Sequence, residues 1–408
     1  MYRMRKLFLF ESPTYIDWVI YFTAFILLQV PAIINFYFND GTHNAYVQFA
    51  DSLLHGNLYL PDTWNVGDLA SFKGKIYLPY PPLPSIILMP FVALFGTAHI
   101  NTVAVATIMA CVSLYLIYNI LTKLRIEKDY IIWIIAAVFF GTGFWYALFT
   151  SHHVYAFAHI TSFMFQLLII NELLGKKRWW LIGFFIGCTF FTRQFTIVYV
   201  LFAAGYMLYL SKKEKQVLSV KNVLSLLTPI ALFVGLYLFY NYLRFGNAVD
   251  SGYSHINFIG VLKERVDRYG VFSARYVPYN LYCTLIKGFN IQFQGETNLN
   301  IKDMDLWGTS LLAASPFFIA SLKADWPKLL KVSAWATILV VLVGQLFYHN
   351  NGFEQVNSSR FTLDFLPLLI VLMALGLSKI PMWLVKILIS YAVLLNVVSF
   401  VIHLLYQR

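Results

Sequence analysis

The chain has 408 residues, of which 59% are hydrophobic and only 12% are charged. Soluble proteins carry about 25% charged residues, so the composition excludes a soluble domain and identifies an integral membrane protein. The net charge of +11 could suggest a nucleic-acid partner, but basic residues of membrane proteins gather in cytoplasmic loops, and we expect no such partner. The three cysteines are too few and too scattered for a disulfide framework or a metal cluster.

Apolar runs in the sequence predict the membrane-spanning helices. A helix needs about 20 apolar residues to cross about 30 Å of hydrocarbon. Seven runs meet this length, near residues 15–38, 100–124, 130–149, 154–174, 223–242, 329–348 and 382–405. Shorter runs that add further spans lie at 179–192, 195–210, 306–322 and 361–377. We therefore expect an all-α polytopic membrane protein with about 11 transmembrane helices, in which residues 1–408 form a single membrane domain.

The positions of the basic residues predict the orientation of the chain. The Lys/Arg-rich connections are MYRMRK, LTKLRIEKD, GKKR, SKKEKQVLSVK, SLKADWPK and the segment around Lys379 and Lys386. They alternate with connections that, apart from residues 243–305, contain few Lys and Arg, so the positive-inside rule places the N-terminus in the cytoplasm. We call the opposite set the outer connections: residues 39–99, the SHH turn (151–153), the FTRQF turn (191–195), residues 243–305 and the NGFEQVNSSR turn (351–360).

The first outer connection, residues 39–99, is expected to contain two short helices. Residues 44–56 have apolar side chains at spacings of three and four, which predicts an amphipathic helix lying at the membrane surface. Pro81 and Pro82 prevent a helix from running across Tyr80, and they leave a short apolar helix before Gly96. Its 13 residues favour a re-entrant or interfacial position over a span.

The second long outer connection, residues 243–305, is expected to cover a substrate. It contains VLKERVDRYG, in which Leu262, Val266 and Tyr269 share one face of a predicted interfacial helix. The chain shows no internal repeat of the kind that marks many transporters.

Asp40 directly follows the first apolar run and is the first candidate for chemistry. A carboxylate there could simply be a solvated helix end or the N-cap of the next helix. An ionisable side chain at the membrane boundary also lies where a lipid-borne substrate presents its head group.

Three histidines follow one another closely in FTSHHVYAFAH. They could bind a metal or donate hydrogen bonds to a phosphate. Because no acid lies near them in the sequence, we expect His152 and His153 to contact phosphate or acceptor, and His159 to be packed and hydrogen-bonded.

Arg193 and Arg360 are the candidate anion-binding cations. Arg193 lies between two short apolar runs, where it either reaches the interface or binds an anion such as phosphate. Arg360 is followed one helical turn later by Asp364, which predicts either an intrahelical ion pair or a further cation for the outer site.

Several stretches resemble the GT-C superfamily of membrane glycosyltransferases, which use polyprenyl-phosphate sugars. They are an acid after the first span, the pattern Tyr-x-x-x-Ala-x-x-x-x-x-Gly (Tyr46, Ala50, Gly56), YPPLP, FTRQF, NYLRFGNAVDSGY, WGTSLLAASPFF and QVNSSRFTLDFLPLLIVLMALGL. The resemblance covers most of the chain, and it lies more in the order of these motifs than in any one of them.

The resemblance implies Asp40 as the general base and an inverting transfer to a hydroxyl acceptor on the outer face of the cell membrane. Relatives have a second acid where Gly41 stands, so no metal ligand is assigned, although a divalent cation is allowed. Some relatives have a lysine before their Pro-Pro where this chain has Tyr80, so the donor phosphate is expected at Arg193, Arg360, His152 and His153. Weaker substrate-binding candidates are His43, Tyr80, Arg244, Tyr253 and Lys287.

The expected partners are a polyprenyl-phosphate sugar donor, a glycan, lipid or protein acceptor, and the lipid bilayer. A polyprenyl-linked glycan ligase or polymerase would share the cations without needing Asp40. A lipid or solute transporter is the alternative from another class, and two long outer connections without a repeat disfavour it. A GT-C-like scaffold without activity would carry the same motifs.

Overall fold

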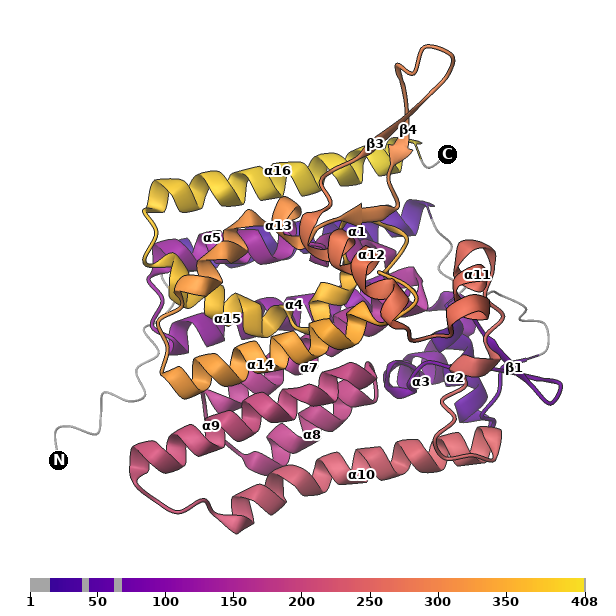
Figure 1. The fold of residues 1–408 in the computed structure, drawn as a ribbon, viewed down its shortest axis with the longest axis horizontal. Helices are drawn as coiled ribbons and strands as arrows, with labels where there is room; N and C mark the ends of the chain where they lie inside the picture. The colour runs from indigo at the N-terminus through magenta and orange to yellow at the C-terminus, as the bar shows by residue number, and fades with distance from the viewer. Residues whose placement is uncertain (1–14, 39–43, 62–67, 407–408) are drawn as a thin grey trace.

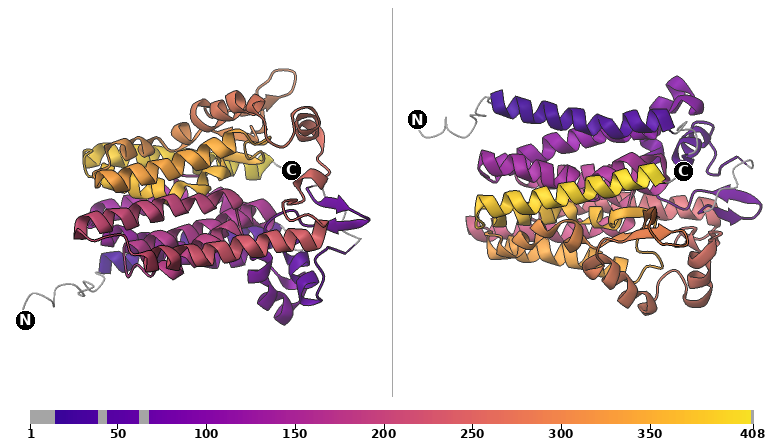
Figure 2. Two further views of the ribbon diagram at one scale, coloured as in Figure 1. Left: turned by 60° about the horizontal axis from the view of Figure 1, so that its bottom comes forward. Right: turned by 90° about the horizontal axis from the view of Figure 1, so that it is seen from above.

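The computed structural model describes residues 15–38, 44–61 and 68–406. Its helices lie side by side, and most of the short elements gather at one end of the bundle (Figure 1; Figure 2). The helices of the bundle are α1 (Tyr15–Phe38), α4 (Thr102–Lys123), α5 (Lys128–Phe140), α6 (Phe144–Phe149), α7 (Val154–Leu173), α8 (Trp179–Phe190), α9 (Tyr199–Glu214), α10 (Val220–Phe245), α14 (Lys328–Leu346), α15 (Leu366–Leu377) and α16 (Met382–Tyr406).

Six of the described helices are long and apolar enough to cross a membrane, and a bent pair makes a seventh if it counts as one span. The chain is therefore a mostly helical, multi-pass membrane protein. Four further apolar helices, α8 and α15 among them, are shorter than a full span. The number of 11 spans stays a prediction.

The run 130–149 forms two helices where one was expected. Helix α5 ends at Phe140 and α6 begins at Phe144, with a bend of 50° between them. The backbone turns here against strand β6 (Gln355–Ser358), because the Gly143 nitrogen donates to the Ser358 hydroxyl at 3.1 Å. A Cβ on Gly143 would lie 2.6 Å from the Ser358 carbonyl oxygen, so only glycine fits.

The run 306–322 does not form the single helix that its hydropathy suggested. It contains strand β5 (Trp307–Thr309), one turn of helix α13 (Leu311–Ala314) and the 3₁₀ segment η8 (Pro316–Lys323). Strand β5 pairs in parallel with β6. Pro316 begins the 3₁₀ segment because proline lacks the amide hydrogen that a continuing helix would need.

Small residues allow the helices of the bundle to approach closely. A Cβ on Gly183 in α8 would lie 2.1 Å from the Leu226 carbonyl oxygen of α10. One on Gly376 in α15 would lie 1.8 Å from the Ala320 carbonyl oxygen of η8. Close backbone approach at small residues is typical of helix packing in lipid, where burying apolar surface gives no driving force.

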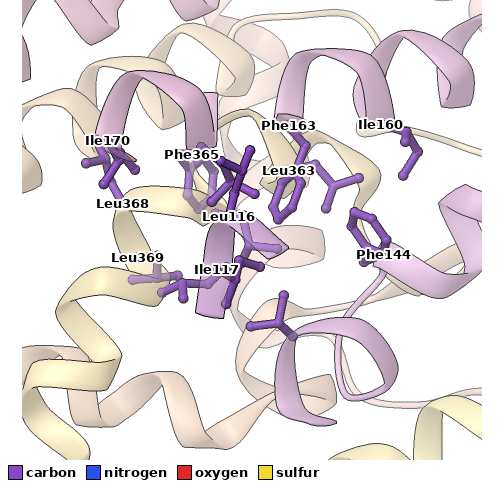
Figure 3. Close-up of a cluster of buried hydrophobic side chains, with 14 of the residues drawn as sticks. Leu116, Ile117, Phe144, Ile160, Phe163, Ile170, Leu363, Phe365, Leu368 and Leu369 are labelled. Atoms are coloured by element: carbon purple, nitrogen blue, oxygen red, sulfur yellow. The ribbon is translucent and has the colours of Figure 1, made fainter. Parts of the chain in front are cut away.

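A buried apolar core joins α4, α6, α7 and α15. Leu116 of α4, Phe163 of α7 and Leu368 of α15 converge in it (Figure 3). Many bulky residues on α1, α10 and α16 are instead exposed, as expected for helices whose outer faces meet lipid.

Both short helices expected in the first outer connection are present. Helix α2 (Ala45–Leu54) begins at the N-cap Asn44, and α3 (Leu83–Phe95) follows the proline pair and ends at Gly96. The apolar face of α2 differs from the prediction, because Tyr46 and Phe49 are buried against protein. A hairpin of β1 (Ala70–Phe72) and β2 (Lys75–Tyr77) lies between the two helices.

The second long outer connection contains the predicted helix as α11 (Gly260–Tyr269), none of whose residues is fully buried. The short α12 (Val277–Leu281) follows it. Strands β3 (Ile291–Gln294) and β4 (Asn300–Met304) form an antiparallel hairpin that projects from the bundle (Figure 1).

Candidate functional site

A cavity of about 1340 Å³ opens where the short elements gather. Each outer connection contributes to its wall, for example through Tyr46, His153, Arg193, Tyr253 and Arg360. None of the lining residues belongs to a Lys/Arg-rich connection. The outer connections therefore meet at the cavity, and the Lys/Arg-rich connections do not line it.

Arg360 is a buried cation on the cavity wall. Arg360 is the first residue of the 3₁₀ segment η9 (Arg360–Asp364), and only 8% of the residue is exposed. Its Nη1 donates to the backbone carbonyls of Gly352, at 2.8 Å, and Phe353, while its Nε is buried without a partner. Within the described part of the chain, this guanidinium forms no ion pair. Its charge is thus available to an anion in the cavity.

Tyr155 holds the guanidinium of Arg360 by stacking. The Arg360 guanidinium lies 3.9 Å from the centre of the Tyr155 ring. On the same ring, His153 stacks at 5.2 Å with an interplanar angle of 15°. The Tyr155 hydroxyl donates to the carboxylate of Glu354. All four residues line the cavity, and together they fix one wall of it.

Arg193 also lines the cavity, but its charge is balanced. Its Nη2 lies 2.7 Å from Oδ2 of Asp364, which is fully buried, and its Nε bonds to both carboxylate oxygens. The intrahelical pair between Arg360 and Asp364 that their spacing suggested is therefore wrong, since Asp364 points across the bundle to Arg193. His159 is packed and bonded to Asp364 at 3.1 Å, as predicted.

Asp68 supplies a carboxylate to the cavity wall. Its backbone has a φ of 69°, a left-handed conformation that Asp tolerates better than most residues. Burial raises the pKa of this carboxyl, and the charge of Glu354 raises it further, while Arg360 acts in the opposite direction. A half-buried acid that faces a buried cation is a common arrangement at functional sites.

Tyrosines form much of the remaining polar surface. Tyr46, Tyr80, Tyr253 and Tyr348 all line the cavity, and the rings of Tyr80 and Tyr253 meet edge to face at 6.2 Å. Burial raises the pKa of Tyr80 and Tyr253, so both hydroxyls stay protonated and can donate hydrogen bonds. Such groups suit a ligand rich in hydroxyl and phosphate oxygens.

The structure brings some of the predicted site residues together and separates others. Arg193, Arg360, His153, Tyr80 and Tyr253 line the cavity. His152 does not; its Nδ1 lies 3.3 Å from the side-chain nitrogen of Asn35 in α1. Asp40 and His43 lie outside the described residues.

Arg244 and Lys287 do not line the cavity either. Arg244 stacks on Tyr240 of the same helix, and its donation to the Leu78 carbonyl at 2.7 Å ties α10 to the first outer connection. Lys287 forms an ion pair of 2.7 Å with Asp305. Both side chains are better explained as supports for the outer connections.

Over residues 15–38, 44–61 and 68–406, no three His, Cys, Asp or Glu side chains are grouped so that they could hold a metal ion. Comparison with known proteins gave no match to a family model, to a curated protein or to a solved structure.

Proposed function

We propose that this chain is an inverting glycosyltransferase that moves a sugar from a polyprenyl-phosphate carrier to a hydroxyl acceptor. One observation carries the proposal: the buried guanidinium of Arg360, which forms no ion pair with any residue that the structure describes, lies on the wall of a large cavity at one end of a membrane bundle. Burying an unpaired cation costs free energy, and such sites persist where an anionic ligand completes them.

The anion is best matched by a phosphate on a lipid. Arg360 and Arg193 come from different outer connections and both face the cavity, and arginine binds phosphate through a planar fork of N–H groups. Some of the residues that line the cavity, among them Val249, Ile259 and Phe272, are apolar and exposed. This combination suits a head group that stays joined to a chain in the bilayer.

The volume supports two substrates. Pockets for one small ligand measure about 300 to 1,000 Å³, and this cavity has about 1340 Å³. A donor head group and an acceptor can therefore meet in it. By the positive-inside rule, we place this end of the bundle on the outer face of the cell membrane and the N-terminus in the cytoplasm.

The reaction is a single displacement. The acceptor hydroxyl gives its proton to a carboxylate, and its oxygen bonds to the anomeric carbon of the sugar as the bond from that carbon to the phosphate oxygen breaks. The electron pair leaves with polyprenyl phosphate, whose charge Arg360 stabilises. The anomeric configuration of the sugar inverts.

The carboxylate that acts as base is assigned to Asp40, as the GT-C resemblance implies. Asp40 lies in the chain between α1 and Asn44, and the next residues, Ala45 and Tyr46, line the cavity. Asp68 is the second candidate for this role, because it lines the cavity and has a raised pKa. A pKa nearer to the working pH favours a general base.

The test is glycosyl transfer by the purified chain in lipid nanodiscs, supplied with a mixture of polyprenyl-phosphate sugars and envelope acceptors. We expect transfer by the wild type and none by Asp40→Asn. Asp51→Asn is the matched control, because Asp51 lies in the same outer connection and does not line the cavity. Full activity of Asp40→Asn would remove Asp40 from the reaction. Absence of transfer by the wild type with every donor would refute the proposed function.

A further inference from the structure

Asp364 lies at the centre of a buried polar network behind the cavity wall. It is fully buried and does not itself line the cavity. One oxygen accepts from Nδ1 of His159 at 3.1 Å, and the other accepts from Nε2 of Gln345 at 2.9 Å. Both oxygens also bond to Arg193. Its partners come from α7, α14 and the break between α8 and α9, so three parts of the bundle fix this carboxylate.

One nitrogen of the Arg193 guanidinium, Nη1, is not used by this network. Nε and Nη2 are both held by Asp364, whereas Nη1 donates to none of the described residues. The Arg193 side chain is 19% exposed and lines the cavity, and Asp364 is not exposed at all. The face of Phe361 lies 5.2 Å from the guanidinium and restricts its tilt. The geometry fixes Arg193 as a directional donor whose positive charge is balanced by the carboxylate of Asp364.

A second arginine in the chain also bonds to one carboxylate through both Nε and Nη2, and this pair has a structural role only. Arg178 donates through Nε and Nη2 to the two oxygens of Glu172 at 3.0 and 2.9 Å. Arg178 belongs to the Lys/Arg-rich GKKR connection and its side chain is 47% exposed, whereas Glu172 lies in the last turn of α7. No cavity-lining residue takes part in this pair. The Arg193–Asp364 pair is more buried than the Arg178–Glu172 pair, and only Arg193 lines the cavity.

We propose that Asp364 is a positioning residue that orients Arg193 toward the phosphate of the lipid-linked donor. The proposal rests on the proposed function, because it names the phosphate as what Arg193 contacts. Asp364 touches no substrate and acts only through Arg193. His159 and Gln345 hold Asp364 in turn, so that the direction of the Nη1 edge is set before the donor arrives.

The test measures binding of two probes, a polyprenyl monophosphate and the matching polyprenol without phosphate, to the full chain in nanodiscs. The ratio of the two affinities measures recognition of the phosphate. A variant that only destabilises the fold should lower both affinities and leave their ratio unchanged. We expect Arg193→Gln to lower this ratio about fivefold, the value of one neutral hydrogen bond of about 1 kcal/mol. Asp364→Glu, which keeps the charge but moves the carboxylate, should lower the ratio by less. Glu172→Gln is the matched control and should leave the ratio unchanged.

The double variant separates positioning from a structural role. If Asp364 acts through Arg193, the double variant should have the same ratio as Arg193→Gln alone, since effects that share one path do not add. A further loss in the double variant of Arg193→Gln and Asp364→Glu, or an unchanged ratio in Asp364→Glu, would overturn the proposal. We expect Asp364→Glu to fold, because it keeps the charge of the buried pair, and to retain a ratio above that of Arg193→Gln. A wild type that does not discriminate between the probes would instead refute the proposed function.

Discussion

Arg360 and Arg193 face the same cavity from two regions of the bundle, but the surroundings of their charges differ. Arg193 is paired with a fully buried carboxylate, whereas Arg360 is held by backbone carbonyls and by the Tyr155 ring. Carbonyl oxygens and an aromatic face orient a guanidinium without cancelling its charge. We therefore expect Arg360 to attract an anion mainly through its charge. We expect Arg193 to bind it mainly through a directional hydrogen bond.

The largest effect should follow from Arg360→Gln. This change removes a charge that no described residue pairs with, and charged hydrogen bonds contribute about 1.5 to 3 kcal/mol, which is about tenfold to a hundredfold in affinity. We expect affinity for polyprenyl monophosphate to fall near the upper end of that range, with polyprenol binding unchanged. Arg360→Lys should recover only part of the loss, because an ammonium cannot reproduce the planar stack on Tyr155. An unchanged affinity in Arg360→Gln would remove this residue from the site.

Asp68→Asn should lower the rate of transfer about tenfold, because an ionised carboxylate is a stronger hydrogen-bond acceptor for the acceptor hydroxyl than an amide. Burial raises the pKa of Asp68, so its proton binds at a higher pH than in an ordinary aspartate. As the pH falls through that raised pKa, wild-type activity should decrease, and the corresponding acid limb should be absent in Asp68→Asn. Identical pH–rate profiles for the wild type and Asp68→Asn would show that Asp68 takes no part in transfer.

Arg193→Gln should weaken binding of polyprenyl monophosphate about fivefold, less than Arg360→Gln. Asp364 is fully buried and loses its cation in this variant, so we expect it to take up a proton. The local net charge then stays near zero, and the change mainly removes a directional hydrogen bond of about 1 kcal/mol. The same titrations in nanodiscs measure both variants. A larger loss in Arg193→Gln than in Arg360→Gln would reverse the comparison between the two arginines.

The smallest effect should follow from Tyr155→Phe. This variant keeps the ring that lies 3.9 Å from Arg360 and removes only the hydroxyl that donates to Glu354. We expect a change of about twofold in affinity for polyprenyl monophosphate. Tyr155→Leu, which removes the stacked ring, should cost more, since a cation–π contact contributes about 0.5 to 2 kcal/mol. Equal affinities for the two variants would show that stacking does not position Arg360.

Much of the fold follows from local patterns in the sequence. The proline pair predicted helix α3, and the apolar spacing predicted α2 and α11, because helix limits depend on residues that are adjacent in the chain. The alternation of basic connections predicted which segments would meet at the cavity. The bend at Gly143 and the strand pairing of β5 with β6 were missed, since both depend on contacts with residues about 50 or more positions away.

The candidate site was less predictable for the same reason. The sequence singled out Arg193, Arg360 and His153, which are unusual at their positions in an apolar chain. It did not reveal that Asp364 pairs with Arg193, a residue 171 positions away. Asp68, Tyr155 and Glu354 were missed as well, since an acid or a tyrosine in an outer connection is common and only the fold shows that these three line one cavity.

The most direct test of glycosyl transfer at Arg360 follows the leaving group. Purified wild type and Arg360→Gln, each in nanodiscs with polyprenyl-phosphate sugars and envelope acceptors, are compared by mass spectrometry for free polyprenyl phosphate and glycosylated acceptor. We predict that both products form in equal amounts with the wild type and at a rate about a hundredfold lower with Arg360→Gln when the donor is scarce. Equal rates for the two proteins, or no free polyprenyl phosphate from the wild type, would contradict this prediction.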